Sequence, residues 1–185
     1  MDKGIRDQLR AGRYDRTDDG LYVPEKNVLV QGVFCYNIRG QEEEFSRNIV
    51  VTQGLNYVLQ AAISDTAPIA NWYIALFTDD VTPLAGWTAA TWRGLSTEWT
   101  NYDEATRGAW TTAAVSSGGT DSFANKASFT SSGDAQTVRG AVLVSASAKN
   151  ADTGILLAAS RLSSDKTLAT GEILDVGYGI QLTAT

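Results

Sequence analysis

The sequence predicts a mainly β protein, with an antiparallel β-sandwich or jelly-roll-like body, one α-helix and an extended N-terminal arm. The main observation is regularity in the last third of the chain, where residues 137–147, 154–162 and 172–182 form three strand-like runs separated by turn residues. Strands this closely spaced favour a sandwich or barrel over βαβ units. Counting all strand-like runs gives roughly eight strands, the number typical of a jelly roll.

Residues 1–25 form the predicted arm, and residues 26–185 form the body. Ile5 and Leu9 are an i,i+4 apolar pair, which is too little apolar area for an independently stable helix. The sequence Asp18-Asp19-Gly20 is a turn signal, and Pro24 prevents regular continuation. Two interpretations stay open, a solvated tail and an arm that orders on a partner surface. Five basic residues at spacings of three or four would share one face of a helical arm: Lys3, Arg6, Arg10, Arg13 and Arg16.

The body begins with a predicted hairpin. Residues 27–39 are rich in β-branched and aromatic side chains and predict a strand, and residues 42–47 predict the return strand after a turn at Gly40. The glutamates at 42–44 indicate a solvated or edge face rather than a metal site, because charge on an edge strand prevents edge pairing. Cys35 is the only cysteine and is interpreted as a small buried residue rather than a reactive thiol.

A helix is predicted over residues 53–63, with Thr52 as its cap and Pro68 beyond its end. Its apolar positions are spaced by three and four and form one stripe, Leu55, Val58, Leu59 and Ala62. Residues 72–77 are apolar at nearly every position, which predicts a strand buried on both faces. Further strands are predicted over residues 108–115 and 126–131.

Five tryptophans fall within a short aromatic-rich part of the chain: Trp72, Trp87, Trp92, Trp99 and Trp110. Tryptophan anchors interfaces as well as cores. Such density in a segment with loop signals predicts that some rings pack between subunits or against a carbohydrate. The predicted protein interface combines three tryptophans with the arm: Ile5, Arg6, Leu9, Arg10, Arg13, Trp87, Trp92 and Trp99.

The residue inventory argues against an enzyme. The chain has no histidine, so it has no Ser-His-Asp triad, no Cys-His pair and no imidazole metal ligand. Asp79-Asp80 could bind a hard cation, but without an alternating acidic loop it is interpreted as a solvated loop start. Asp103-Glu104 lies beside aromatics, as in glycosidases, yet neighbouring side chains point in different directions. We expect Arg107 to pair with Asp103 or Glu104, and we expect no activity, no cofactor and no metal.

Charge and hydropathy limit the partners. The net charge is −6, and residues 1–20 carry equal numbers of acidic and basic residues, so the whole excess lies in the body. An acidic body is a poor general binder of nucleic acid. No apolar run approaches the roughly 20 residues that cross a bilayer, and the charged N-terminus does not look like a secretory signal. We therefore expect synthesis in a cytoplasm and no nucleic-acid or membrane partner.

Several segments resemble structural proteins of tailed-bacteriophage virions. They are residues 48–51 with Gly54 and Leu55, residues 72–77, residues 102–107 with Trp110, and residues 154–161. Together they span most of the body. The chain is similar to head decoration (cement) proteins within that group.

This resemblance implies a capsid decoration protein that binds the outer head shell and links capsomers. It implies the major capsid protein and further copies of the chain as partners, with a homotrimer as the expected oligomer. The expected location is the capsid exterior of the virion, after synthesis in the host bacterial cytoplasm. The alternatives are a tail, head–tail junction or baseplate component, or a carbohydrate-binding module of the virion.

Overall fold

The computed structural model describes residues 15–17, 20–22, 28–64 and 66–184, and the chain divides into two compact units, Met1–Leu29 with Leu182–Thr185, and Val30–Gln181. In the first unit, β1 (Asp15–Thr17) pairs antiparallel with β2 (Gly20–Tyr22), and Thr17 lies opposite Gly20. The chain therefore reverses where the sequence predicts a turn. Arg16 lies in β1, so the helical face predicted for the basic residues does not extend to it.

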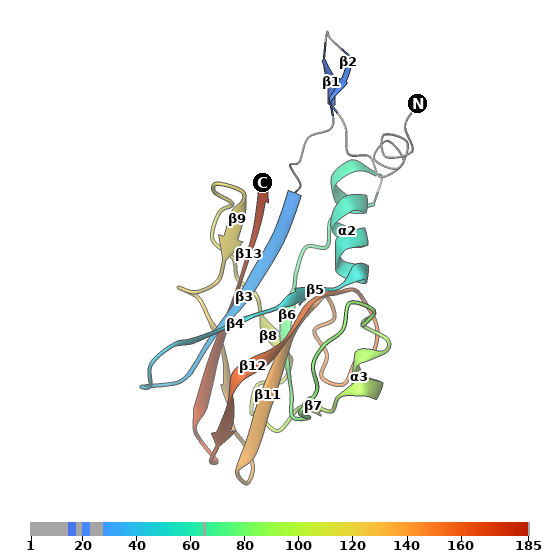
Figure 1. Cartoon of the computed structure of the whole chain (residues 1–185). Coiled ribbons are helices and arrows are strands. Elements are labelled where there is room, and N and C mark those ends of the chain that lie inside the picture. Colours follow the sequence, from blue (N-terminus) through green and yellow to red (C-terminus); the bar gives the residue numbers. More distant parts are fainter. Residues whose placement is uncertain (1–14, 18–19, 23–27, 65, 185) are drawn as a thin grey trace. The chain divides into compact units, whose positions relative to one another are not determined.

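Two mainly antiparallel sheets form the body, which confirms the prediction of a mainly β, sandwich-like fold (Figure 1). The first sheet has the strand order β10 (Ala127–Thr130), β13 (Ile173–Ala184), β3 (Val28–Ile38), β4 (Glu44–Arg47), and β9 (Gly119–Asp121) also pairs with β13. The second has the order β5 (Ile49–Val50), β12 (Leu156–Leu168), β11 (Gln136–Val144), β6 (Tyr73–Phe77), β7 (Glu98–Trp99), and β8 (Gly108–Ala109) pairs with β6. The described residues thus form 13 strands rather than eight, because several have only two or three residues.

The main core fills the space between the two sheets. Inward side chains alternate along the strands, as the two-residue period of a strand requires. The five-stranded sheet contributes Phe34, Tyr36, Phe129, Leu174, Val176 and Tyr178. The six-stranded sheet contributes Ile74, Leu76, Ala141, Leu143, Ala158 and Leu162.

A second core lies on the other face of the six-stranded sheet. Phe77 and Val142 belong to it, whereas Ile74 and Leu76 belong to the main core, so β6 is buried on both faces as predicted. The connection after β6 covers this face and includes a short second helix, α3 (Trp92–Leu95), that the sequence does not predict. The sandwich therefore carries an additional irregular layer.

Two predicted boundaries in the second half are wrong. The residues Ser163-Ser164-Asp165 predict a turn, but β12 runs through them. They lie at an irregularity in the pairing with β11, between the register pairs Gly140–Arg161 and Val138–Lys166, and their side chains are exposed or half-buried while Leu162 and Leu168 are buried. The turn residues therefore interrupt the pairing without ending the strand. The strand predicted over residues 108–115 is reduced to the two residues of β8.

The predicted helix is confirmed as α2 (Thr52–Ile63), with a different start and a different buried face. Val51 occupies the N-cap position without a side-chain hydrogen bond, so Thr52 is the first helical residue and not the cap. The contact with the sheet is made at Gly54, where an added Cβ would lie 2.4 Å from the carbonyl oxygen of Leu157 on β12. The predicted stripe is largely exposed, and only Val58 packs against the main core.

Candidate functional site

The outward face of β13 carries glycine at two alternate positions, Gly177 and Gly179. The ring of Phe123 occupies the space that side chains would fill. An added Cβ would lie 3.2 Å from Phe123 Cδ1 at Gly177 and 2.8 Å from Phe123 Cζ at Gly179. The aromatic ring therefore packs directly against the β13 backbone and is held there by close contact. Glycine within a strand often marks such an approach.

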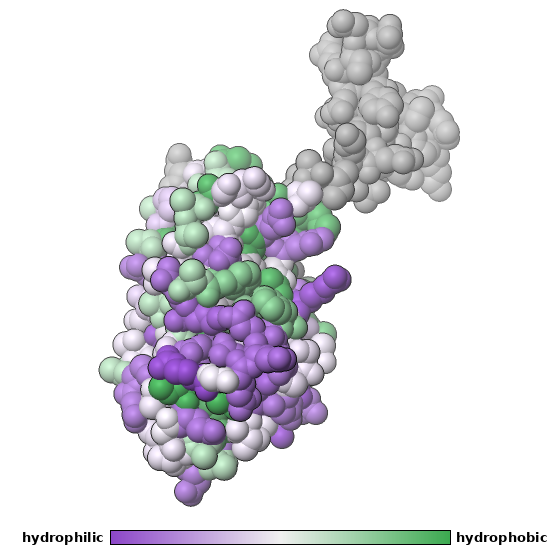
Figure 2. All heavy atoms as spheres, turned by 90° about the vertical axis from the view of Figure 1, so that its left-hand side faces the viewer, coloured by the Kyte–Doolittle hydropathy of each residue, from purple (hydrophilic) through white to green (hydrophobic). Residues whose placement is uncertain are grey.

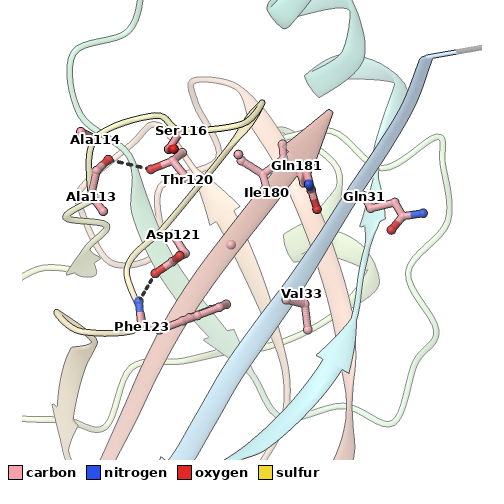
Figure 3. A pocket seen from close by; sticks show the side chains of 12 residues that line it. Gln31, Val33, Ala113, Ala114, Ser116, Thr120, Asp121, Phe123, Ile180 and Gln181 are labelled. Carbon is pink, nitrogen blue, oxygen red and sulfur yellow. Dashed lines mark hydrogen bonds between the residues drawn. The ribbon is translucent and has the colours of Figure 1, made fainter. Parts of the chain in front are cut away.

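A trough of about 450 Å³ lies beside Phe123, between β3, β13 and the segment around β9 (Figure 3). Gly179 and Ile180 lie along its β13 side. The other lining residues are Gln31, Val33, Ala113, Ala114, Ser116, Gly119, Thr120, Asp121, Phe123 and Gln181. On the side of the molecule formed by the five-stranded sheet, hydrophobic side chains lie in patches between strongly hydrophilic ones (Figure 2).

Three planar polar groups project from the trough lining. The side-chain amides of Gln31 and Gln181 make no hydrogen bond to another described residue, and both residues are exposed. One carboxylate oxygen of Asp121, Oδ1, accepts a hydrogen bond of 2.9 Å from the backbone N–H of Phe123. This bond fixes the carboxylate beside the ring. The trough therefore presents amide donors and acceptors and one oriented carboxylate.

A second depression, of about 370 Å³, lies on the other side of Phe123, which lines both. Its charged groups are already paired. Arg39 Nη2 lies 2.7 Å from Asp175 Oδ1, and Lys126 forms an ion pair with Glu43. The hydrogen bond from Lys126 is the main cause that holds the pKa of Glu43 below its ordinary value.

Cys35 lies on the same sheet, opposite Phe45 in the β3–β4 register. It is fully buried, which confirms its interpretation as a buried residue. Burial raises the pKa of its thiol to about 12.

The Phe45 and Phe123 rings pack edge to face with centroids 6.0 Å apart, and Phe45 is exposed. The exposed aromatic surface of this face is therefore built from phenylalanine and not from tryptophan.

Helix α2 presents an apolar surface to solvent. Leu55, Leu59 and Ile63 follow at intervals of four and are 42%, 58% and 75% exposed. None of the 12 residues of the helix is charged. The outer side of a surface helix normally carries charged or polar residues. We call these three side chains the α2 face.

The predicted partners of Arg107 are wrong. Its guanidinium makes a bidentate pair with Glu98, with Nε–Oε1 and Nη2–Oε2 distances of 2.8 and 2.7 Å. Both side chains are fully buried. Arg107 also donates to the carbonyl oxygens of Ala146 and Ala151, so the pair joins β7 to the loop after β11. Glu104 accepts hydrogen bonds from the backbone and hydroxyl of Thr130 instead.

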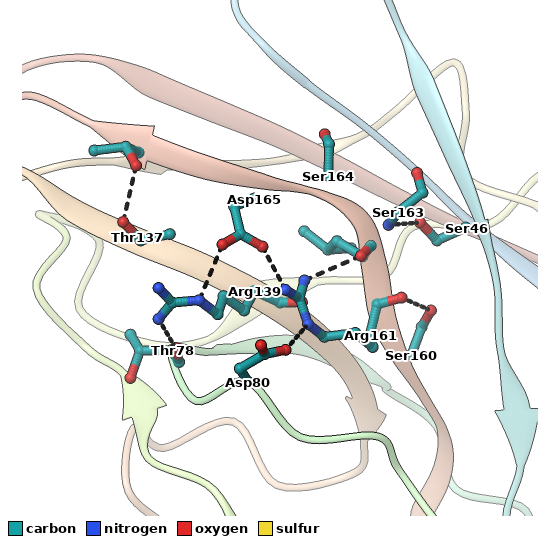
Figure 4. A network of polar contacts seen from close by, with 12 residues as sticks. Ser46, Thr78, Asp80, Thr137, Arg139, Ser160, Arg161, Ser163, Ser164 and Asp165 are labelled. Atoms are coloured by element: carbon teal, nitrogen blue, oxygen red, sulfur yellow. Dashed lines mark hydrogen bonds and ion pairs between the residues drawn. The ribbon is translucent and has the colours of Figure 1, made fainter.

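The acidic pair after β6 is also bound by protein donors. Asp80 pairs with Arg161, which also pairs with Asp165, and Asp165 pairs with Arg139 (Figure 4). The hydrogen bond from Arg161 is the largest cause that lowers the pKa of Asp165. Asp79 accepts a hydrogen bond from the backbone N–H of Thr97. Within the part of the chain that the structure describes, no group of three or more His, Cys, Asp or Glu side chains could hold a metal ion.

The predicted tryptophan interface is wrong. Trp87, Trp92 and Trp99 are 4%, 0% and 1% exposed within the single chain. Trp87 and Trp92 lie in the second core because the connection folds back over the six-stranded sheet, and Trp99 lies in the main core. Their rings cover apolar surface of the same chain. Trp72 and Trp110 are partly buried against the main core.

The arm residues of the predicted interface, Ile5, Arg6, Leu9, Arg10 and Arg13, lie outside the described residues. The trough and the α2 face were not predicted as sites. Two signals could have indicated them. The alternating glycines of β13 indicate that another group packs closely against the strand. A helix without charged residues indicates a surface that is unusually apolar for a solvent-exposed helix.

Comparison of the chain with protein-family models and with curated proteins finds no match. None of the described helices has the length and apolar character needed to cross a bilayer.

Proposed function

We propose that this chain is a structural protein of a tailed-bacteriophage virion that decorates the outer head shell and links capsomers. The resemblance of its sequence to phage structural proteins motivates the proposal. The α2 face is the structural observation that carries it, because a decoration protein requires a surface that favours protein contact. The role is non-catalytic, and its partners are the major capsid protein and further copies of the chain, with a trimer as the proposed oligomer.

The α2 face suits attachment to another protein. Fully burying a leucine or isoleucine side chain contributes about 1.5–3 kcal/mol relative to leaving it in water. Leu59 and Ile63 are more than half exposed and stand to gain most. The absence of charge on the helix means that no ionised side chain of α2 must be desolvated on contact. The major capsid protein is the occupant we assign to this face.

A shell module must also keep its shape while bound. Arg107, paired with Glu98, also bonds to the distant carbonyls of Ala146 and Ala151, and the Asp80–Arg161–Asp165–Arg139 network likewise joins segments that lie far apart in the sequence. Both cores pack against the same six-stranded sheet. These contacts support a rigid body that binds by its surface and needs no internal rearrangement.

The test is binding of the purified chain to heads of its own phage that lack it. Replacing Leu59 and Ile63 together by glutamine should preserve folding, because both side chains are mostly exposed, and should weaken head binding at least tenfold. Leu95→Gln on α3, where Leu95 is 52% exposed, is the matched control and should bind normally. Equal binding of all three proteins would refute the attachment face.

The position of the protein in the particle tests the wider proposal. Imaging of intact virions should show many copies distributed over the head by its icosahedral symmetry. A single ring of copies on the tail axis would instead establish a tail, head–tail junction or baseplate component. Either location is compatible with the fold, so this observation decides the role.

A further inference from the structure

We propose that the trough beside Phe123 is a binding site for a neutral oligosaccharide. The inference does not depend on attachment to a capsid, because the trough and the α2 face are formed by different residues. The carbohydrate alternative predicted from the tryptophans loses its basis once their rings are buried. Other residues, which the sequence analysis did not identify as a site, now support carbohydrate binding. They are Phe123, Gln31, Gln181 and Asp121.

The chemistry of the lining fits a sugar. A pyranose presents one apolar patch of C–H groups and a rim of hydroxyls, each of which both donates and accepts. Phe123 supplies an aromatic surface, whose electron-rich face attracts C–H groups. Gln31 and Gln181 each offer a carbonyl oxygen and an NH₂ group, and the carboxylate of Asp121 accepts. A small number of placed polar groups in a mainly apolar lining is typical of a ligand site.

The charge pattern selects a neutral ligand. Among the described residues that line the trough, Asp121 carries the only ionised side chain, and its carboxylate opposes an anionic ligand. The cations of the neighbouring depression, Arg39 and Lys126, are paired with Asp175 and Glu43 and so are not available to balance an acidic sugar without breaking those pairs. The body as a whole is acidic, which adds to this discrimination.

The site is held in place before any ligand arrives. Phe123 rests on the backbone at Gly177 and Gly179, and its own N–H fixes the Asp121 carboxylate. Prior ordering lowers the entropy lost on binding. Phe123 also lines the second depression, where Asn37 and Gln41 add further amides. The two depressions together suit a chain of sugars rather than one unit.

The test uses the full-length chain on a printed array of neutral and acidic glycans, followed by calorimetry and ligand-observed NMR with the soluble oligosaccharides that bind. Neutral glycans should bind. The double variant Gln31→Ala/Gln181→Ala removes only exposed side chains and should lower affinity about tenfold, as expected for losing two hydrogen-bonding groups. Phe123→Ala should lower it by a similar factor or more, because it removes the aromatic surface.

Leu59→Gln/Ile63→Gln is the control that separates this proposal from the previous one, and it should bind glycans normally. No neutral glycan bound on the array or by NMR overturns the proposal. Selective binding of acidic glycans also overturns it. So does neutral-glycan binding that the Gln31→Ala/Gln181→Ala variant leaves unchanged, because that result places the ligand elsewhere.

Discussion

Loss of the Arg107 side chain should lower the stability of the fold substantially. Its guanidinium and the Glu98 carboxylate are both fully buried. Removing Arg107 takes away the bidentate partner and leaves the buried carboxylate with the backbone N–H of Asn150 and a longer ion pair to Arg93 Nε, at 3.6 Å. We expect Arg107→Met to lower the free energy of unfolding by about 3–5 kcal/mol, measured by denaturant titration. Arg39→Met is the matched control. Arg39 also pairs bidentately with an acid, Asp175, but is 55% exposed, and its loss should cost about 0–1 kcal/mol.

Replacing both partners separates the contribution of the two charges to stability from that of side-chain packing. Glu98→Leu combined with Arg107→Met removes both charges and should recover part of the stability lost in the single variant. An Arg107→Met protein as stable as the parent would contradict the reading of this pair as a structural requirement.

The thiol of Cys35 should titrate far above its ordinary range. Burial raises its pKa from 9.0 to about 12, and it is the only cysteine. Because tyrosines ionise near pH 10 and also absorb in the ultraviolet, the thiolate signal is taken as the difference between the parent and Cys35→Ala. Absorbance of the thiolate should show a midpoint near 12 in the folded protein and near 9 in the unfolded chain. A folded protein whose thiol ionises near pH 9 would show that Cys35 is accessible.

The same shift makes stability depend on pH. The folded pKa lies above the unfolded pKa, so the unfolded state loses its proton first. The contribution of Cys35 is therefore complete below pH 9 and is lost as the pH rises towards 12. We expect Cys35→Ala to show a shallower decline in unfolding free energy over this interval than the parent.

At the scale of the element, two helical glycines should respond in opposite directions to the same change. Gly54→Ala brings a Cβ within 2.4 Å of the Leu157 carbonyl oxygen, and a backbone atom cannot move aside as a side chain can. The helix–sheet contact must open, which should cost about 1–3 kcal/mol despite the better helix propensity of alanine.

Gly94→Ala in α3 is the comparison, because nothing lies within 4 Å of its added Cβ. It should leave stability unchanged or raise it by up to about 1 kcal/mol. Thermal unfolding of the two variants beside the parent measures both effects. Equal melting temperatures for Gly54→Ala and Gly94→Ala would show that α2 does not pack on β12 at this distance.

For the whole molecule, we expect the body to fold without the arm and the arm to contribute to incorporation into the particle. Removing residues 1–25 should leave the β-rich body folded, because every buried core residue of the described chain lies beyond residue 30. It should weaken incorporation into the particle, since Ile5 and Leu9 are too few to fold alone and need a partner surface. Competition between the full and shortened chains for empty heads, read by gel density, measures the effect.

A second arm variant identifies which arm residues matter. Replacing Lys3, Arg6, Arg10 and Arg13 by glutamine keeps the apolar pair and removes the basic charge. If charge attracts the arm to an acidic neighbour, this variant should lose incorporation most clearly at low salt. Full incorporation of the shortened chain would contradict a role for the arm, whatever the charge variant does.

The elements with strong local patterns could be predicted before any tertiary contact was known. The apolar run at residues 72–77 indicated a strand buried on both faces, and β6 is one, because only such a strand can bury successive apolar side chains. The hairpin of β3 and β4 and helix α2 likewise follow from β-branched content, a glycine turn and a 3.6-residue period. These signals lie within a few residues of one another along the chain.

Which faces are buried and which side chains come into contact depends on how the whole chain packs. The tryptophans of the connection are core residues because the chain folds back over the six-stranded sheet, and the stripe on α2 is exposed because the helix docks through Gly54. Glu98 with Arg107, and Phe123 with Gly177 and Gly179, are contacts between segments whose proximity depends on strand order. Periodicity shows that a side chain is apolar, but only the packing of the whole chain determines what covers it.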